Sequence, residues 1–259
     1  MIRFASLGSG SSGNSTVVEA TSGITTTRLL VDAGMSLREV EARLARVGLA
    51  GSDLDAVFVT HEHGDHIGCA VALAERYGLA LWMSRGTRRA LGDVTMPARF
   101  RFARDGEMIQ VGDLELRPFT VAHDAAEPLQ LRCSDGDSCV VVLTDLGSIT
   151  SHMIDNVAVC DALVLECNHD EGLLAASRYP ASLKARIGGR FGHLSNRVAV
   201  ELLGRVAGDR LRHLVAAHLS RENNSPALAR AALATRWGSR PEDIVVADPD
   251  RGFDWLRLG

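Results

Sequence analysis

Three histidines and one aspartate lie within six residues of the chain, directly after a strand-like apolar run at residues 56–60. His61 and His63 are two positions apart, so both can point from one side of an extended loop toward a single cation. Asp65 and His66 follow at once and can reach a second cation beside the first. Neutral imidazole and carboxylate ligands suit zinc, manganese or iron, and too few soft ligands lie here for a closed structural zinc site. We therefore expect a metal centre rather than a set of solvated loop histidines.

Three further candidate ligands each end an apolar run later in the chain. They are His123 after residues 119–122, Asp145 after residues 140–144, and His218 after residues 214–217. The HxHxDH spacing and the order of these residues resemble the metallo-β-lactamase superfamily. The segments at residues 7–15, 166–170, 192–196 and 217–224 are similar to its YycJ/WalJ-type branch, whose members are regarded as DNA-processing exonucleases. The resemblance covers essentially the whole chain.

The resemblance implies a fold and a set of metal ligands. The fold is an α/β four-layer αββα sandwich of the metallo-β-lactamase type. An inserted cap domain is not expected, because only about 70 residues separate Asp145 from His218. Two divalent ions (zinc, manganese or iron) would be held at the edge between the sheets. The implied ligands are His61, His63 and His123 for the first ion, Asp65, His66 and His218 for the second, and Asp145 as the bridge.

The ligand types favour hydrolysis. Two cations a few ångströms apart can hold a hydroxide and can neutralise the charge that develops in an in-line displacement. No cysteine stands where a thiolate would indicate a β-lactamase-like zinc site, and His63 stands where redox relatives have a glutamate. The hydroxide would attack phosphorus, with Asp65 orienting it. His193 and His169 are candidate proton donors to the leaving group, and a surface or supporting role is the alternative for each.

The glycine-rich segment at residues 8–13 matches the GxGxxG spacing, but the β-branched, alternating residues 15–20 predict a strand, not the helix that a dinucleotide site requires. This loop could instead hold a phosphate or be a plain tight turn. Basic residues near His193 could contact DNA phosphates. The alternative is that they only form a charged face exposed to solvent. The candidate substrate-binding residues are Ser11, Ser12, Asn14, Arg186, Arg190, Ser195 and Asn196. A second arginine-rich stretch at residues 85–104 is a weaker candidate.

The composition fits one α/β domain spanning residues 1–259. The net charge of −4 gives no global attraction to nucleic acid, but it leaves room for a local basic channel. The chain shows no signal-peptide pattern and no run of about 18 apolar residues.

Five cysteines without a CxxC pair fit a reducing compartment, with a Cys133–Cys139 disulfide as the less favoured alternative. Cys167 is a mild departure from the branch, which has a small polar residue there. We expect a cytoplasmic protein without membrane association or organic cofactor, and no feature of the sequence fixes an oligomeric state.

The pattern of apolar residues and turn formers predicts two series of strands, each followed by helices. The predicted strands are residues 2–6, 15–20, 28–32, 56–60, 79–83, 108–111, 114–121, 129–133, 139–143, 162–166, 213–216 and 244–247. The predicted helices are residues 36–47, 67–77, 85–91 and 226–237. Ser36 and Glu39 should form a capping box at the start of the first helix.

The function that these features favour is a dinuclear-metal phosphodiesterase that hydrolyses DNA as an exonuclease. A phosphodiesterase for a small cyclic or nucleotide substrate would use the same metals and would lack a basic track leading away from the site. A thioester or lactam hydrolase would need an apolar pocket instead. A regulatory protein that kept only the fold should have lost ligands, and all seven are present.

Overall fold

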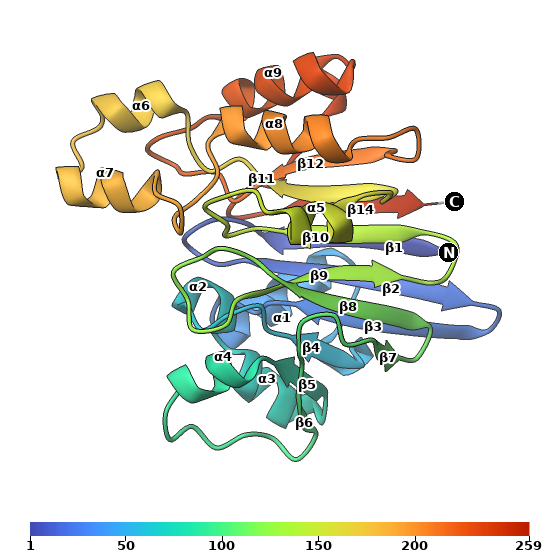
Figure 1. The fold of residues 1–259 in the computed structure, drawn as a ribbon. Coiled ribbons are helices and arrows are strands. Elements are labelled where there is room, and N and C mark those ends of the chain that lie inside the picture. Colours follow the sequence, from blue (N-terminus) through green and yellow to red (C-terminus); the bar gives the residue numbers. More distant parts are fainter. Residues whose placement is uncertain (259) are drawn as a thin grey trace.

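The computed structural model describes residues 1–258 as two seven-stranded sheets that pack face to face, with helices on both outer faces (Figure 1). In the first sheet the strands lie in the order β14-β1-β2-β3-β4-β5-β6. Their bounds are β1 (Ile2–Gly8), β2 (Ser15–Ser22), β3 (Thr25–Val31), β4 (Ala56–Phe58), β5 (Ala80–Met83), β6 (Phe100–Phe102) and β14 (Phe253–Leu258). The sheet is antiparallel from β14 to β3 and parallel from β3 to β6.

The second sheet has the mirrored organisation, in the order β13-β12-β11-β10-β9-β8-β7. Its strands are β7 (Ile109–Val111), β8 (Leu114–Thr120), β9 (Leu129–Ser134), β10 (Cys139–Leu143), β11 (Ala162–Glu166), β12 (His213–Ala217) and β13 (Val245–Val246). The strands from β10 to β13 are parallel, so their carboxyl ends reach the same edge of the sheet.

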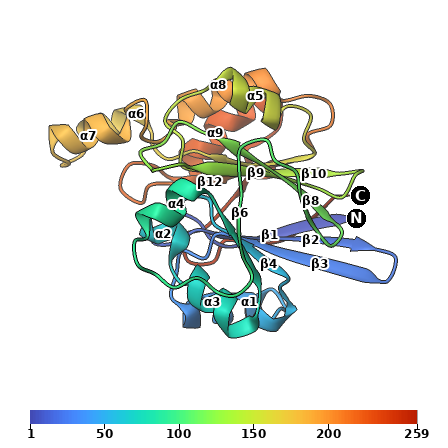
Figure 2. The ribbon, with the colours of Figure 1, turned by 60° about the horizontal axis from the view of Figure 1, so that its bottom comes forward.

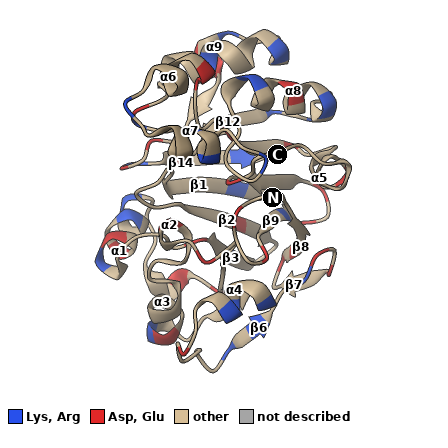
Figure 3. Ribbon diagram, turned by 60° about the vertical axis from the view of Figure 1, so that its left-hand side comes forward, with Lys and Arg blue, Asp and Glu red and all other residues tan. Residues whose placement is uncertain are grey.

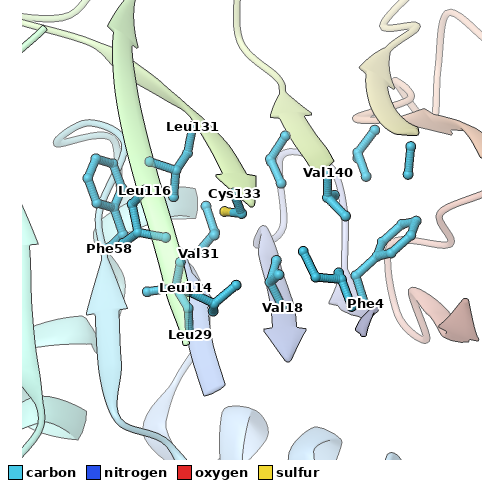
Figure 4. Packing of buried hydrophobic residues seen from close by; sticks show 14 of the residues in the cluster. Phe4, Val18, Leu29, Val31, Phe58, Leu114, Leu116, Leu131, Cys133 and Val140 are labelled. Carbon is cyan, nitrogen blue, oxygen red and sulfur yellow. The ribbon is translucent and has the colours of Figure 1, made fainter. Parts of the chain in front are cut away.

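The central core lies between the two sheets. Figure 4 shows Phe4, Val31 and Phe58 from the first sheet facing Leu116 and Val140 from the second. Alternate side chains of each strand point to the outer face of its sheet, where they form a second apolar layer that packs against the helices. Burial on both faces explains the nearly continuous apolar runs of β10 and β11.

Helices cover each outer face. The first sheet is covered by α1 (Leu37–Arg46) and α3 (Ala70–Tyr77), and the second by α5 (Ser151–Val157), α8 (Asn196–Val206) and α9 (Pro226–Trp237). The remaining helices are α2 (Gly64–Ile67), α4 (Arg85–Ala90), α6 (Glu171–Ala176) and α7 (Ala181–Ile187). The four-layer αββα arrangement expected from the sequence is thereby confirmed, as is the capping box of Ser36 and Glu39. No helix of the described residues combines the length and apolarity needed to cross a bilayer.

Helices α6 and α7 form an arm that projects from the second sheet (Figures 1 and 2). No residue of α7 is buried. The segment between Asp145 and His218 holds α5, β11, this arm and α8, so no further domain is inserted there.

Several predicted boundaries differ from the structure. The helix predicted at residues 67–77 is split into α2 and α3 at Gly68, whose φ of 31° is left-handed and whose added Cβ would lie 2.3 Å from the carbonyl oxygen of Ala33. The helix therefore breaks where the chain must pass the end of β3. Strands β6 and β14 were not predicted. The segment after the glycine-rich loop is a strand, β2, as predicted, which excludes the dinucleotide fingerprint.

Candidate metal centre and its cleft

The predicted ligands converge from both sheets at the edge where parallel strands end. The segment after β4 carries His61 to His66, and α2 begins within it. His123 follows β8, Asp145 follows β10 and His218 follows β12. Because these ends lie on both sides of the sandwich, ions held here would connect the two sheets.

The first predicted ligand group brings three imidazoles together. His61 Nε2 lies 3.1 Å from His63 Nδ1, and His123 Nε2 lies 3.3 Å from the same His63 atom. Burial, with the nearby His66, holds the pKa of His61 well below its usual range, and burial also lowers the pKa of His123. The rings of His61 and His123 are therefore neutral and keep a lone pair for a metal ion.

The second group surrounds Asp145, whose side chain is buried. Its Oδ2 lies 2.8 Å from His66 Nε2 and 2.7 Å from His218 Nδ1. Asp65 Oδ2 completes the group at 3.7 Å from His66 Nε2 and 3.8 Å from His218 Nε2. Burial opposes ionisation of Asp145, but His218 and His66 outweigh it and hold its pKa well below the usual range. An ionised carboxylate at the centre of the cluster favours cations.

This donor set fits divalent ions. Three subsets of the cluster each place one donor atom per residue within 4.8 Å of the others: His61 with His63 and His123, His61 with His66 and Asp145, and Asp145 with Glu166, His193 and His218. Imidazoles aimed at one another and at one buried carboxylate have no better partner than a cation. The assignment of each ligand to a particular ion, and the number of two ions, stay predictions.

Asp32 contacts the ligands from the side away from the cleft, and it was not among the predicted site residues. It follows β3, is buried, and places Oδ2 2.8 Å from His66 Nδ1. The Thr60 backbone N–H donates to Asp32 Oδ1 at 2.8 Å, and the Thr60 hydroxyl lies 3.0 Å from His61 Nδ1. A carboxylate on Nδ1 fixes the tautomer that leaves Nε2 free to bind metal.

Glu166 supports His193 in the same way and was also missed. Glu166 ends β11, is fully buried, and lies 2.8 Å from His193 Nδ1 through Oε1. Its Oε2 accepts the backbone N–H groups of Leu146 and Leu194. Burial alone would lower the pKa of His193, but Glu166, with Asp145 and Asp124, raises it to about 9. The ring is thus held protonated, with Nε2 not engaged by this carboxylate.

Three residues of the centre adopt left-handed backbone conformations that non-glycine residues seldom take. Asp32, Asp145 and His218 have φ values of 60°, 56° and 53°. Asp32 and His218 directly follow β3 and β12, and Asp145 lies two residues after the end of β10, where the chain must turn sharply to aim a side chain into the centre. Such conformations cost about 1–3 kcal/mol each and cluster at functional sites.

A cleft of about 370 Å³ opens onto the centre. Its walls include His63, Asp65, Asp145, His193 and His218. On one side lie Leu183, Arg186 and Ile187 of α7, and on the other lies Ser11 of the glycine-rich loop. The Arg186 Nε–H donates to Asp124 Oδ2 at 2.7 Å, which ties the arm to the loop that carries His123. Of the predicted substrate-binding residues, Ser11 and Arg186 therefore line the cleft.

The other predicted contacts lie elsewhere. Asn14 is buried, with Nδ2 3.0 Å from His66 Nε2. Ser195 caps α8 and donates to Glu171, and Asn196 exchanges hydrogen bonds with Asn224. None of these three is part of the cleft wall.

Three further predicted residues are also outside the wall. Ser12 is exposed, and Arg190 follows α7, with its guanidinium 5.5 Å from the centre of the Phe191 ring. His169 is buried, with Nδ1 3.3 Å from Asn168 Oδ1, and burial lowers its pKa. Its position makes it less suited to proton donation than His193.

The chain is similar in sequence to named exonucleases and in structure to other proteins of this fold. The sequence model of the metallo-beta-lactamase superfamily matches residues 8–137. Exodeoxyribonuclease WalJ of Streptococcus pneumoniae is 35% identical over 98% of this chain and 92% of its own. Exodeoxyribonuclease YycJ of Bacillus anthracis is 35% identical over 90% of this chain and 88% of its own. The crystal structure of the metallo-beta-lactamase fold protein YhfI from Bacillus subtilis superimposes with a TM-score of 0.74 at 17% identity, covering 98% of both chains. The chain belongs to the metallo-β-lactamase superfamily and is a relative of its WalJ and YycJ exonucleases.

Proposed function

We propose that the protein is a metal-dependent phosphodiesterase that removes nucleotides from DNA ends. The observation that carries this proposal is the ligand cluster in the wall of a cleft that Arg186 of α7 also lines. Two relatives of nearly full coverage are named exodeoxyribonucleases, which supports DNA as the substrate. The five cysteines, free in the structure, support a reducing, cytoplasmic setting for such an enzyme.

The basic arm favours a polyanion over a small ester. Arg186 of α7 lines the cleft, and three further basic residues lie outside its wall: Arg178 between α6 and α7, Lys184 on α7 and Arg190 just after α7. A small cyclic or nucleotide substrate would fill the cleft without reaching that far. Cleft residues such as Asp65, His193 and Arg186 also differ from the apolar wall that a thioester or lactam substrate would need.

The residues around the cleft divide the chemical work. Divalent ions bound by the cluster would supply a nucleophile at neutral pH and offset charge on the phosphate oxygens. Asp65, partly exposed in the cleft wall, can accept a hydrogen bond from the attacking water and so orient it. His193 has Nδ1 engaged by Glu166, so its Nε2–H is the group that can give a proton to the leaving oxygen. Arg186, once released from Asp124, can pair with a phosphate.

The test is hydrolysis of linear DNA labelled at one end, by protein reconstituted with manganese or zinc. We expect stepwise shortening from one end, and none from His61→Ala, which removes an implied ligand. Turnover of bis-p-nitrophenyl phosphate without any DNA shortening would overturn the proposal in favour of a small-substrate phosphodiesterase.

A further inference from the structure

A second pocket, of about 380 Å³, opens at the edge of the sandwich where β6 and β7 are the outermost strands. Its wall includes Asp55, which directly precedes β4, Trp82 of β5 and, from the second sheet, Gln110 of β7. The metal ligands follow the carboxyl end of β4, whereas this pocket lies at its amino end. At about 3.3 Å per residue, Asp55 is about 20 Å from His61 along the extended chain, so the pocket is separate from the metal cleft. Its volume suits a small molecule.

Two arginines of the edge strand β6 and the residue before it line this pocket. Arg101 stands opposite Trp82 in the sheet register, and Arg99 directly precedes β6. Phe100 packs against the outer apolar layer, and side chains alternate along a strand, so Arg99 and Arg101 face the second sheet. Figure 3 shows the blue arginine segments of β6 near the lower end of the molecule. The space between two packed sheets is normally apolar, so guanidinium groups on this face need an explanation.

The positive charge of these arginines is largely uncompensated. Among residues 1–258, neither guanidinium forms an ion pair with a carboxylate, and each makes one hydrogen bond, to a backbone carbonyl oxygen. A guanidinium carries five N–H donors, so most of them remain available to a ligand. Asp55 is the one carboxylate in the pocket wall, and its Oδ2 already accepts a backbone N–H at 2.7 Å. Two arginines against one aspartate leave the wall with a net positive charge.

The same wall contains a buried hydrogen-bond donor without a partner. The indole nitrogen of Trp82 is buried and contacts no acceptor among residues 1–258. Such a group is energetically costly and rare in folded proteins. Charged side chains that point inward from an edge strand can protect it from pairing with other sheets, but that role requires neither a pocket nor an unpaired donor.

We propose that this pocket is a second ligand site, which binds the phosphate group of a small molecule such as a nucleoside monophosphate. Two guanidinium groups and one indole N–H can donate to several oxygens, and a terminal phosphate presents three oxygens where a carboxylate presents two. A phosphate within a DNA backbone is attached on two sides, so it enters a pocket between two sheets less readily than a terminal phosphate. The ligand site does not depend on the proposed hydrolysis of DNA.

The Trp82 indole N–H gives a readout that is specific for this pocket. Of the three tryptophan indole signals in a ¹H–¹⁵N NMR spectrum, the one lost in Trp82→Phe belongs to Trp82. With zinc-loaded protein, we expect inorganic phosphate and dAMP to shift this signal in a saturable way, and acetate at the same ionic strength to leave it nearly unchanged. The double variant Arg99→Gln with Arg101→Gln should raise the Kd for phosphate by about tenfold or more.

The double variant Arg89→Gln with Arg104→Gln is the matched control. Both of these arginines are exposed and lie outside the pocket wall, and their replacement removes the same charge. It should leave the Kd for phosphate unchanged.

The other outcomes decide against the proposal. A Trp82 signal that responds to neither phosphate nor dAMP would overturn the ligand site, and so would an equal rise in Kd in the two double variants. A response to a short DNA without terminal phosphates, but not to dAMP, would replace the small ligand with the DNA backbone. Shortening of end-labelled DNA tests the proposed function separately and is unaffected by each of these results.

Discussion

At the scale of single residues, Asp32 determines whether His66 can bind a metal ion. In Asp32→Asn, the side-chain oxygen can still accept the Thr60 N–H, and the new NH₂ group then faces His66 Nδ1. An NH₂ donor there favours the tautomer that carries its hydrogen on Nε2, where the metal should bind. We expect zinc affinity to fall by about 10- to 100-fold, as measured by competition with a chromophoric chelator.

The control for this substitution is Asp161→Asn. Asp161 is also fully buried, and its carboxylate accepts the Cys139 backbone N–H and pairs with Arg210, away from the metal ligands. Its replacement should alter stability but not zinc affinity. Equal losses of zinc affinity in the two variants would mean that Asp32 acts through general stability and not through His66.

At the scale of elements, the sequence predicted which strand ends carry ligands but not which buried carboxylates stand behind them. The ligands were recognisable because each directly follows an apolar run, as Asp145 follows β10. The contacts Asp32–His66 and Glu166–His193 join residues that are 34 and 27 positions apart in the sequence. No local sequence pattern predicts a contact over such a separation. Strand β14 was missed for the same reason, because it forms by pairing with β1 at the far end of the chain.

A cross-strand ladder in the first sheet gives a test of stability against pH. Glu19 on β2 pairs in register with Arg3 on β1 and Arg28 on β3, and its side chain is buried. Burial would raise the pKa of Glu19, but hydrogen bonds from Arg3 and Arg28 outweigh it and hold the pKa below the reference value of 4.5. The ladder therefore stabilises the fold fully above pH 4.5, and this contribution is lost as pH falls through the lower folded-state pKa.

We expect Glu19→Gln to lower the free energy of unfolding near pH 7 by about 1–3 kcal/mol. The difference from wild type should shrink below pH 4.5, where the wild-type carboxyl also loses its charge. Urea unfolding from pH 7 to pH 3 measures this, with both proteins under the same metal conditions. Glu115→Gln, at an exposed position of β8, is the control. A difference between Glu19→Gln and wild type that stays constant across this range would contradict the assignment.

At the scale of the whole molecule, the metal centre links the two sheets of the sandwich. His61 and His66 come from the first sheet, whereas His123, Asp145 and His218 come from the second. Ions that bind only the folded arrangement stabilise it by mass action, by about 2.7 kcal/mol at a free concentration 100 times Kd. For a chain of this size that corresponds to a rise in Tm of about 5–10 °C.

We therefore expect chelation to lower the Tm of the wild-type protein and zinc to restore it in a concentration-dependent way, as followed by calorimetry. His61→Ala should lose most of this response, because it removes a donor from two of the three ligand subsets. His152→Ala should keep the response, because His152 is exposed and pairs with Asp105 rather than with the cluster. A wild-type Tm that does not respond to zinc would show that the centre forms equally well without ions, and the buried imidazoles would then need another source of compensation.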